Sequence, residues 1–428
     1  MQPDKPSPDA KNVGVITDED IALQKEMVGL DEPNQTREFH SCLSADTIRN
    51  FALNVGDDNP LYVDSDYARR TRWGAPIAPA IMMAVVNEPL RGERLPKDMR
   101  ARARGLFPGC QMFMSGGTWN WYRPIYAGDT IFSFEGEDSV EVKASEFGGR
   151  TVHIVRRYVK FNQRGEVVGI YRALRIIAER KTAREKGKYA ALEMAHYSKD
   201  EVKAIDADYL GEAPRGGQGR FWEDVAEGDE LSPIRKGPLT VTDVFLAHCA
   251  GYGFAPYRML ATGRVAAKDR QIMRGMYSRN DQGVYDTEAR VHWDRDLAKQ
   301  VGNPEAYDWG LQREFWLHHL LTDWAGDDGF VVSQRDEIRK FNYIGDLQML
   351  TGRVVRKYAA DAGHMVDVEI CATNQRGEKT ALAWATIALP SREVGAVVLP
   401  EVPVELARKA AEFLKIHNAG WGGAGGKG

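Results

Sequence analysis

Cysteine is scarce in this chain of 428 residues, and its distribution excludes several classes of protein. The four cysteines, Cys42, Cys110, Cys249 and Cys371, are scattered without CxxC spacing. Paired cysteines at short spacing are typical of zinc and redox sites, and regular spacings mark disulfide-stabilised secreted domains. We therefore expect buried free thiols and a cytoplasmic protein.

Long apolar runs and an excess of basic charge are missing as well. No window approaches the roughly 20 apolar residues of a membrane-spanning helix, and the polar N-terminus has no signal-peptide core. The formal net charge is −4, which argues against nucleic acid as the main partner because phosphate binding requires a basic face. No HExxH, EF-hand or Walker-type spacing occurs, so we expect neither a metal nor nucleotide hydrolysis.

The chain instead contains an internal repeat of about 200 residues. Three short patterns occur in the same order in both halves: an Asp followed four residues later by Ala, then a Gly-Asp pair, and then Asn-Gln-Arg-Gly-Glu. They lie within 62–68, 128–129 and 162–166 in the first half and within 292–298, 345–346 and 374–378 in the second. The constant order indicates a tandem duplication.

In each half, helical patterns precede alternating patterns that are typical of antiparallel strands. The strands are expected within 113–177 and 331–387, and buried helices at Pro79–Val86 and 310–324. A helix followed by a twisted sheet, duplicated in tandem, predicts an α+β fold in which one sheet wraps each helix and the two sheets pair edge to edge. The expected units are a mobile arm at 1–15, a first domain at 16–180, a linker at 181–220, a second domain at 221–395 with an insertion at about 257–291, and a helix with a disordered glycine-rich tail at 396–428.

The segment Gly56–Asp64, Gly-Asp-Asp-Asn-Pro-Leu-Tyr-Val-Asp, places a carboxylate, a carboxamide and a phenol within one turn of a loop between apolar segments. Such clustering suits a small reaction pocket, and the same residue types are also common in surface turns. Together with Ala68, the segment resembles the Gly-Asp-x-Asn-Pro-Leu-His-x-Asp…Ala signature of MaoC-like (R)-specific enoyl-CoA hydratases and dehydratases. The segments 73–79 and 123–129 are similar to the next motifs of that family, and residues 16–29 resemble the start of a MaoC dehydratase N-terminal domain.

The resemblance covers residues 16–180 and, more weakly, 221–392. It implies a double hot-dog fold with two long helices, each wrapped by an antiparallel sheet. It also implies reversible addition of water across the C2=C3 bond of 2-enoyl thioesters of CoA, as in fatty acid metabolism, with the CoA thioester as substrate and no other cofactor. A homodimer, or a hetero-oligomer with a second hydratase subunit, is the expected assembly.

Position by position, Asp57 matches the catalytic Asp of this family and Asn59 matches the residue that orients the loop. The family's His is replaced by Tyr62, whose phenol has an ordinary pKa near 10 and is a poor base. Pro79 and Ala80 match substrate-binding positions, with Ala80 in place of the glycine whose backbone N–H stabilises the oxyanion.

The second half departs from the signature in a complementary way. His292 matches the family's His, and Gly310 matches the oxyanion glycine at the start of a helix. The upstream segment 251–256 lacks the Asp, and the basic insertion after it is either a contact for CoA phosphates or a solvated excursion. We therefore expect Asp57 to be the principal base, aided by Tyr62 or by His292 across the pseudo-two-fold axis.

Two other functions are compatible with the same residues: a non-catalytic acyl-CoA-binding subunit of a hetero-oligomeric hydratase, and a hot-dog acyl-CoA thioesterase. His318 and His319 are adjacent on an apolar helix, where neighbouring side chains point about 100° apart, so we do not expect a metal pair there. Neither the acyl group nor the reaction direction follows from the sequence.

Overall fold

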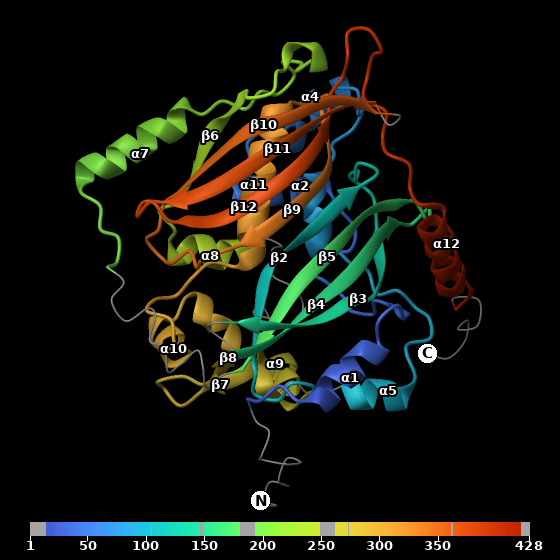
Figure 1. Cartoon of the computed structure of the whole chain (residues 1–428), viewed down its shortest axis with the longest axis vertical. Helices are drawn as coiled ribbons and strands as arrows, with labels where there is room; N and C mark the ends of the chain where they lie inside the picture. Colours follow the sequence, from blue (N-terminus) through green and yellow to red (C-terminus); the bar gives the residue numbers. More distant parts are fainter. Residues whose placement is uncertain are drawn as a thin grey trace, which may run out of the picture.

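The computed structural model describes residues 14–103, 105–145, 149–179, 193–248, 262–272, 274–360 and 363–420. Within these residues, ten strands form one continuous antiparallel sheet in the order β1-β3-β4-β5-β2-β9-β12-β11-β10-β6 (Figure 1). The first half contributes β1 (Asp31–Pro33), β2 (Gln111–Trp121), β3 (Ile131–Ser145), β4 (Gly149–Asn162) and β5 (Val167–Ala178). The second half contributes β6 (Glu230–Lys236), β9 (Phe330–Ile338), β10 (Gln348–Ala360), β11 (Gly363–Asn374) and β12 (Lys379–Ala388).

The two halves join where β2 pairs with β9, through Thr118 with Arg335, Trp119 with Gln334 and Asn120 with Ser333. The predicted edge-to-edge pairing is confirmed, and it covers one otherwise exposed edge of each half. Close approach at this joint requires glycine. A Cβ atom on Gly116 (φ +103°) would lie 2.2 Å from the backbone oxygen of Asp336.

The central helix of the second half is α11 (Gly310–Ala325), in which twelve of the sixteen residues are buried. It packs against β6, β9 and β12 and also reaches β2 of the first half. The first half has α2 (Ala45–Val55) and the six-residue 3-10 helix η1 (Ala80–Val85) at the corresponding place. The α+β double hot-dog class is confirmed, with the difference that only the second half contains a long central helix. The helix expected at Pro79–Val86 ends at Val85. Val86 already has an extended backbone, and β-branched residues disfavour helix.

The remaining elements surround this sheet. The helices are α1 (Asp18–Glu26), α3 (Pro60–Val63), α4 (Ser65–Arg70), α5 (Lys97–Ala103), α7 (Lys199–Gly211), η2 (Trp222–Asp224), α8 (Val241–Ala247), α9 (Gly263–Ile272), η5 (Arg274–Met276), η6 (Glu288–His292), α10 (Arg295–Gln300) and α12 (Val404–Ala419), and a separate hairpin consists of β7 (Tyr277–Arg279) and β8 (Tyr285–Thr287).

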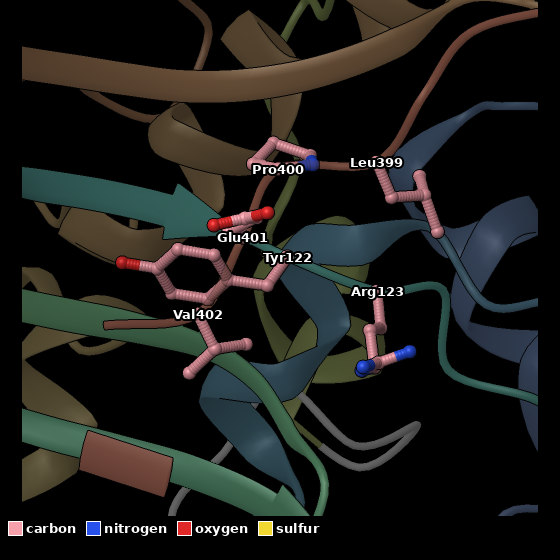
Figure 2. Close-up of a pocket in the computed structure, with 6 residues that line it drawn as sticks. All are labelled: Tyr122, Arg123, Leu399, Pro400, Glu401 and Val402. Carbon is pink, nitrogen blue, oxygen red and sulfur yellow. The ribbon is translucent and has the colours of Figure 1, made fainter. Parts of the chain in front are cut away.

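After β12 the chain returns to the first half, where α12 packs on β3, β4 and β5 through an apolar cluster that includes Phe134, Phe161 and Phe413. The segment before α12 lines a surface pocket together with Tyr122 and Arg123 (Figure 2). This pocket shares no residue with the loop 56–64, and its shallow lining offers no group for acid–base chemistry beyond exposed charges. The pocket forms where the C-terminal segment crosses the end of the sheet.

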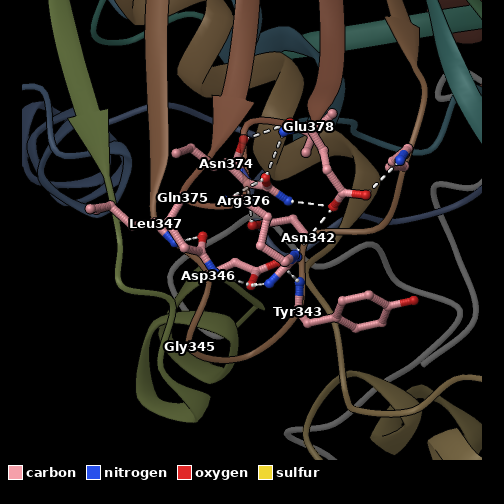
Figure 3. Close-up of polar contacts among 12 residues, drawn as sticks. Asn342, Tyr343, Gly345, Asp346, Leu347, Asn374, Gln375, Arg376 and Glu378 are labelled. Atoms are coloured by element: carbon pink, nitrogen blue, oxygen red, sulfur yellow. Dashed lines mark hydrogen bonds and ion pairs between the residues drawn. The ribbon is translucent and has the colours of Figure 1, made fainter. Parts of the chain in front are cut away.

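The repeated Asn-Gln-Arg-Gly-Glu sequence has a structural explanation (Figure 3). In the second half it forms the β11–β12 turn and holds the Gly-Asp turn that precedes β10. Arg376 binds both carboxylate oxygens of Asp346, at 2.6 and 2.7 Å. Gln375 donates to Asp346 at 2.8 Å and accepts from the backbone N–H of Leu347 at 2.9 Å. The repeated residues therefore clamp two turns together.

The same clamp occurs in the first half. Arg164 lies 3.1 Å from Asp129, and Gln163 donates to Asp129 at 3.2 Å. The repeated Asp upstream also has matching roles, since Asp64 caps α4 and Asp294 caps α10 by accepting backbone N–H bonds. The equivalence of these contacts confirms the duplication and shows that the repeated residues are structural.

Several expectations concern residues outside the described ranges, namely most of the arm at 1–15, the segment 251–256, the start of the insertion, and the tail 421–428. The expected burial of the cysteines is wrong for those that the structure describes, because Cys42 is exposed and Cys110 and Cys371 are half-buried. In the described part of the chain, no helix combines the length and apolar character needed to span a membrane.

Candidate active site

The loop after α2 carries Asp57 into the interior. Helix α2 ends at Gly56, which adopts the left-handed conformation (φ 77°, ψ 32°) that favours glycine. The next residue, Asp57, is only 3% exposed and accepts a backbone hydrogen bond from Asn59 at 3.1 Å. Asn59 in turn caps α3 and donates to Asp327 at 3.1 Å, just beyond the end of α11. The loop of the first half is thereby fixed to the central helix of the second.

The residue that faces Asp57 is His319 of α11. Its Nε2 lies 3.8 Å from Asp57 Oδ1, which is too long for a direct hydrogen bond and suits one bridging oxygen atom. The Nδ1 of His319 lies 2.8 Å from the Nζ of Lys236 in β6. Lys236 also donates to the backbone oxygen of Val55 at 2.7 Å, so it connects the histidine to the end of α2. Three elements from both halves therefore hold one carboxylate and one imidazole in place.

Burial sets the protonation states of these groups. It raises the pKa of Asp57 from 3.8 to about 7, although the Asn59 hydrogen bond and the Lys236 charge act in the opposite direction. Burial, together with the Lys236 charge, lowers the pKa of His319 well below 6.5, so the imidazole is neutral. Burial also lowers the pKa of Lys236 to about 8. Since the ammonium group only donates, His319 Nδ1 accepts and Nε2 carries the proton that faces Asp57.

A narrow pocket lies between α2, η1 and α11, and in this conformation it is too tight to hold a water molecule. Its lining consists of four apolar residues and three polar ones: Val55, Pro79, Ile81, Phe315, Asp57, His318 and His319. An apolar pocket with a few convergent polar groups and a carboxyl whose pKa lies near neutrality is typical of a catalytic site. In the described ranges, no group of three or more His, Cys, Asp or Glu side chains is arranged to hold a metal ion.

Tyr62 lies near Asp57, as expected, whereas His292 has its contacts within the second half. Tyr62 is buried near Asp57 and forms a hydrogen bond with Thr322; burial and then the Asp57 charge raise the pKa of its phenol well above 10, so it stays neutral. His292 donates its Nδ1–H to the backbone oxygen of Tyr307 at 2.9 Å, and its ring packs 3.8 Å from the Trp309 ring, both in the second half. The histidine that the structure brings to Asp57 is therefore His319.

The predicted substrate-binding positions flank the same region. Pro79 lines the cavity, and Ala80 is the first residue of η1, where no side chain caps the helix start. The Trp121 indole N–H donates to the backbone oxygen of Ala80 at 3.0 Å and holds this turn in place. Gly310 begins α11, as expected.

The sequence alone does not identify His319 and Lys236 as site residues, because neither belongs to a motif. One signal was available for the histidine. Helix α11 carries five polar residues among its buried positions, Gln312, Arg313, Glu314, His318 and His319, and buried polar side chains require partners. Lys236 carried no comparable signal, because a lysine beside a strand end is ordinarily solvated.

Comparisons with known proteins agree with this architecture. Residues 34–170 match a family model described as the FAS1-like dehydratase domain region. A solved structure named MaoC-like dehydratase superposes with a TM-score of 0.57 at 16% identity, covering 86% of this chain and 99% of that one. A MaoC domain dehydratase from Chloroflexus aurantiacus J-10-fl gives 0.49 at 12% identity, covering 85% and 96%. A conserved hypothetical protein from Mycobacterium tuberculosis, described as a double hotdog fold, gives 0.45 at 12% identity, covering 84% and 96%. No curated protein matches the chain by sequence.

At these identities the structural likeness establishes the fold: the chain has the double hot-dog architecture of a MaoC-like dehydratase. The family match adds a dehydratase region that contains Asp57, Asn59 and Ala80. The resemblance expected from the sequence motifs is thereby confirmed, and in general terms the comparisons support a hydratase or dehydratase.

Proposed function

We propose that this chain catalyses reversible hydration of 2-enoyl thioesters of CoA at one site, in which the first half supplies Asp57 and the second half supplies His319. The observation that carries the proposal is the pair of side chains 3.8 Å apart on a narrow, mainly apolar pocket. The pocket leaves no room for a water molecule in this conformation, so substrate binding requires its lining side chains to move.

In the proposed reaction, the water oxygen lies between Asp57 and the Nε2–H of His319. As the oxygen bonds to C3, Asp57 accepts a water proton and the C2=C3 electrons move toward the thioester oxygen. The backbone N–H of Ala80 stabilises the enolate oxygen that forms. Asp57 then returns its proton to C2, which completes the addition of one water. A pKa of about 7 suits a group that must both accept and return a proton at neutral pH.

Loss of enoyl-thioester absorbance tests this proposal, with short, long and aromatic 2-enoyl-CoAs. We expect turnover of at least one of these substrates. Asp57→Asn should reduce kcat by about 10²- to 10⁴-fold, whereas Asp58→Asn, at the exposed neighbouring carboxylate, serves as the matched control and should leave the rate unchanged.

The same assay distinguishes the alternatives. Release of free CoA thiol without hydration would identify a thioesterase. Binding of CoA esters without turnover of any enoyl substrate would indicate a binding subunit that needs a catalytic partner. Either result would overturn the proposed function.

A further inference from the structure

A second histidine, His318, also lines the cavity and has no role in the steps above. It is 1% exposed, and its Nε2 atom is buried without a hydrogen-bond partner. The ring packs 4.7 Å from Trp121, the residue that holds Ala80. Buried polar atoms in native proteins are nearly always paired, so an unpaired one facing a cavity points to a ligand.

The neighbours of His318 define its protonated nitrogen. The side-chain nitrogen of Gln334 lies 3.2 Å from the backbone oxygen of Glu314, which can only accept, so this end of the amide is the donor. The opposite end, Gln334 Oε1, can only accept and lies 2.9 Å from His318 Nδ1. Nδ1 therefore carries the hydrogen. Since burial lowers the pKa of His318 to about 4, the ring is neutral and Nε2 presents a lone pair.

A buried carboxyl pair fixes Gln334 in turn. Its side-chain nitrogen lies 2.9 and 3.1 Å from the two carboxyl oxygens of Asp336. The Trp119 indole N–H lies between Asp336 (3.1 Å) and Glu314 (2.8 Å). Burial raises the pKa of Glu314 to about 7, and burial with the Glu314 charge raises that of Asp336 well above 3.8, so the pair retains a proton at neutral pH. Gln334 is fully buried, and these partners hold its side-chain amide in one orientation.

None of the other lining groups donates to this lone pair, because His318 Nε2 has no hydrogen-bond partner. Four of the lining residues are apolar, and His319 directs its Nε2–H toward Asp57. A donor for His318 would therefore come from a molecule that enters the pocket, namely water or a substrate hydroxyl group. The hydrated product contains such a donor in its hydroxyl group. An unsaturated or saturated acyl group has no hydroxyl group.

We propose that His318 Nε2 accepts a hydrogen bond from the C3 hydroxyl group of a 3-hydroxyacyl thioester, which makes His318 the residue that recognises the hydroxyl. This inference rests on the proposed function, since it concerns the same cavity. Gln334 and the Glu314–Asp336 pair are positioning residues that hold the acceptor toward the substrate. A site built to bind a hydroxyl discriminates strongly against the analogue that lacks it, because its own acceptor is then left unpaired.

The test compares two CoA thioesters that cannot react because C2 carries no hydrogen: 3-hydroxy-2,2-dimethylpropanoyl-CoA and 2,2-dimethylpropanoyl-CoA. Calorimetry gives their dissociation constants for the wild type, for His318→Asn, and for His153→Asn on β4 as the matched control. Asn retains a donor for Gln334 but has no acceptor at the Nε2 position. We expect the wild type and the control to prefer the hydroxylated ester by about tenfold or more, and His318→Asn to lose the preference.

Equal affinity of the wild type for the two esters, or an unchanged preference in His318→Asn, would overturn the inference. Imidazole ¹⁵N NMR of the wild type provides a test that needs no variant. Protonation of His318 at Nδ1 is expected, and protonation at Nε2 would contradict the proposal. Both readouts are independent of turnover, so failure of the hydration assay and failure of this inference remain distinguishable.

Discussion

Replacing Asp57 with Asn should abolish activity and at the same time stabilise the fold. Burial raises the pKa of this carboxyl from 3.8 to about 7, so the folded chain binds its proton more tightly than the unfolded chain. The ionised carboxylate therefore costs stability above pH 7, and the cost disappears as the pH falls toward 4. The pKa difference corresponds to about 4 kcal/mol at pH 8 and about 2 kcal/mol at pH 5.5. Asn has nearly the same shape and carries no charge.

Urea denaturation of wild type and Asp57→Asn at the two pH values measures this difference. The variant should be more stable at pH 8, by an amount that falls by roughly half at pH 5.5. Asp58→Asn removes an exposed carboxylate next to it and should change the unfolding free energy by less than about 0.5 kcal/mol. A variant that is no more stable than the wild type at pH 8 would refute the reasoning, because it would show that Lys236 fully offsets the cost of burial.

Other substitutions test individual contacts. Lys236→Met should lower kcat/KM at least about tenfold, because the active-site histidine loses the donor that fixes its tautomer. Tyr62→Phe should retain activity and cost about 1 kcal/mol of stability, since the neutral phenol only donates a hydrogen bond. His292→Ala should also retain hydration activity, because its partners lie in the second half. Arg376→Ala leaves the buried Asp346 without its cationic partner and should destabilise the chain by about 3 kcal/mol in urea melts, with unchanged activity per folded molecule.

The fold was largely predictable from the sequence because its signals are local. Alternating strands, turn glycines and the Asn-Gln-Arg-Gly-Glu repeat all act over short distances, and the clamp on Asp346 and on Asp129 explains why the repeat persists in both halves. The helix expected at Pro79–Val86 is present over Ala80–Val85 as a 3-10 helix, a type that an apolar run does not distinguish from an α-helix.

The site was only half predictable. Asp57 belongs to a contiguous motif, and the structure places it in the cavity, as the motif suggested. Its partner His319 lies 262 residues further along the chain, and no local pattern connects the two. The motif predicts His292 as the partner because it occupies the family's histidine position. In the structure, α11 brings His319 to the carboxylate instead. Contacts between the halves depend on tertiary packing, which the motif alone does not specify.

The measurement that tests the central claim most directly is a double-mutant cycle on hydration of a short 2-enoyl-CoA, with Asp57→Asn, His319→Gln and the double variant. If the two residues from different halves hold the same water, they act as one unit, and the double variant should lose little more kcat than Asp57→Asn alone. Losses that multiply, or a His319→Gln variant with wild-type activity, would contradict a single site formed by both halves.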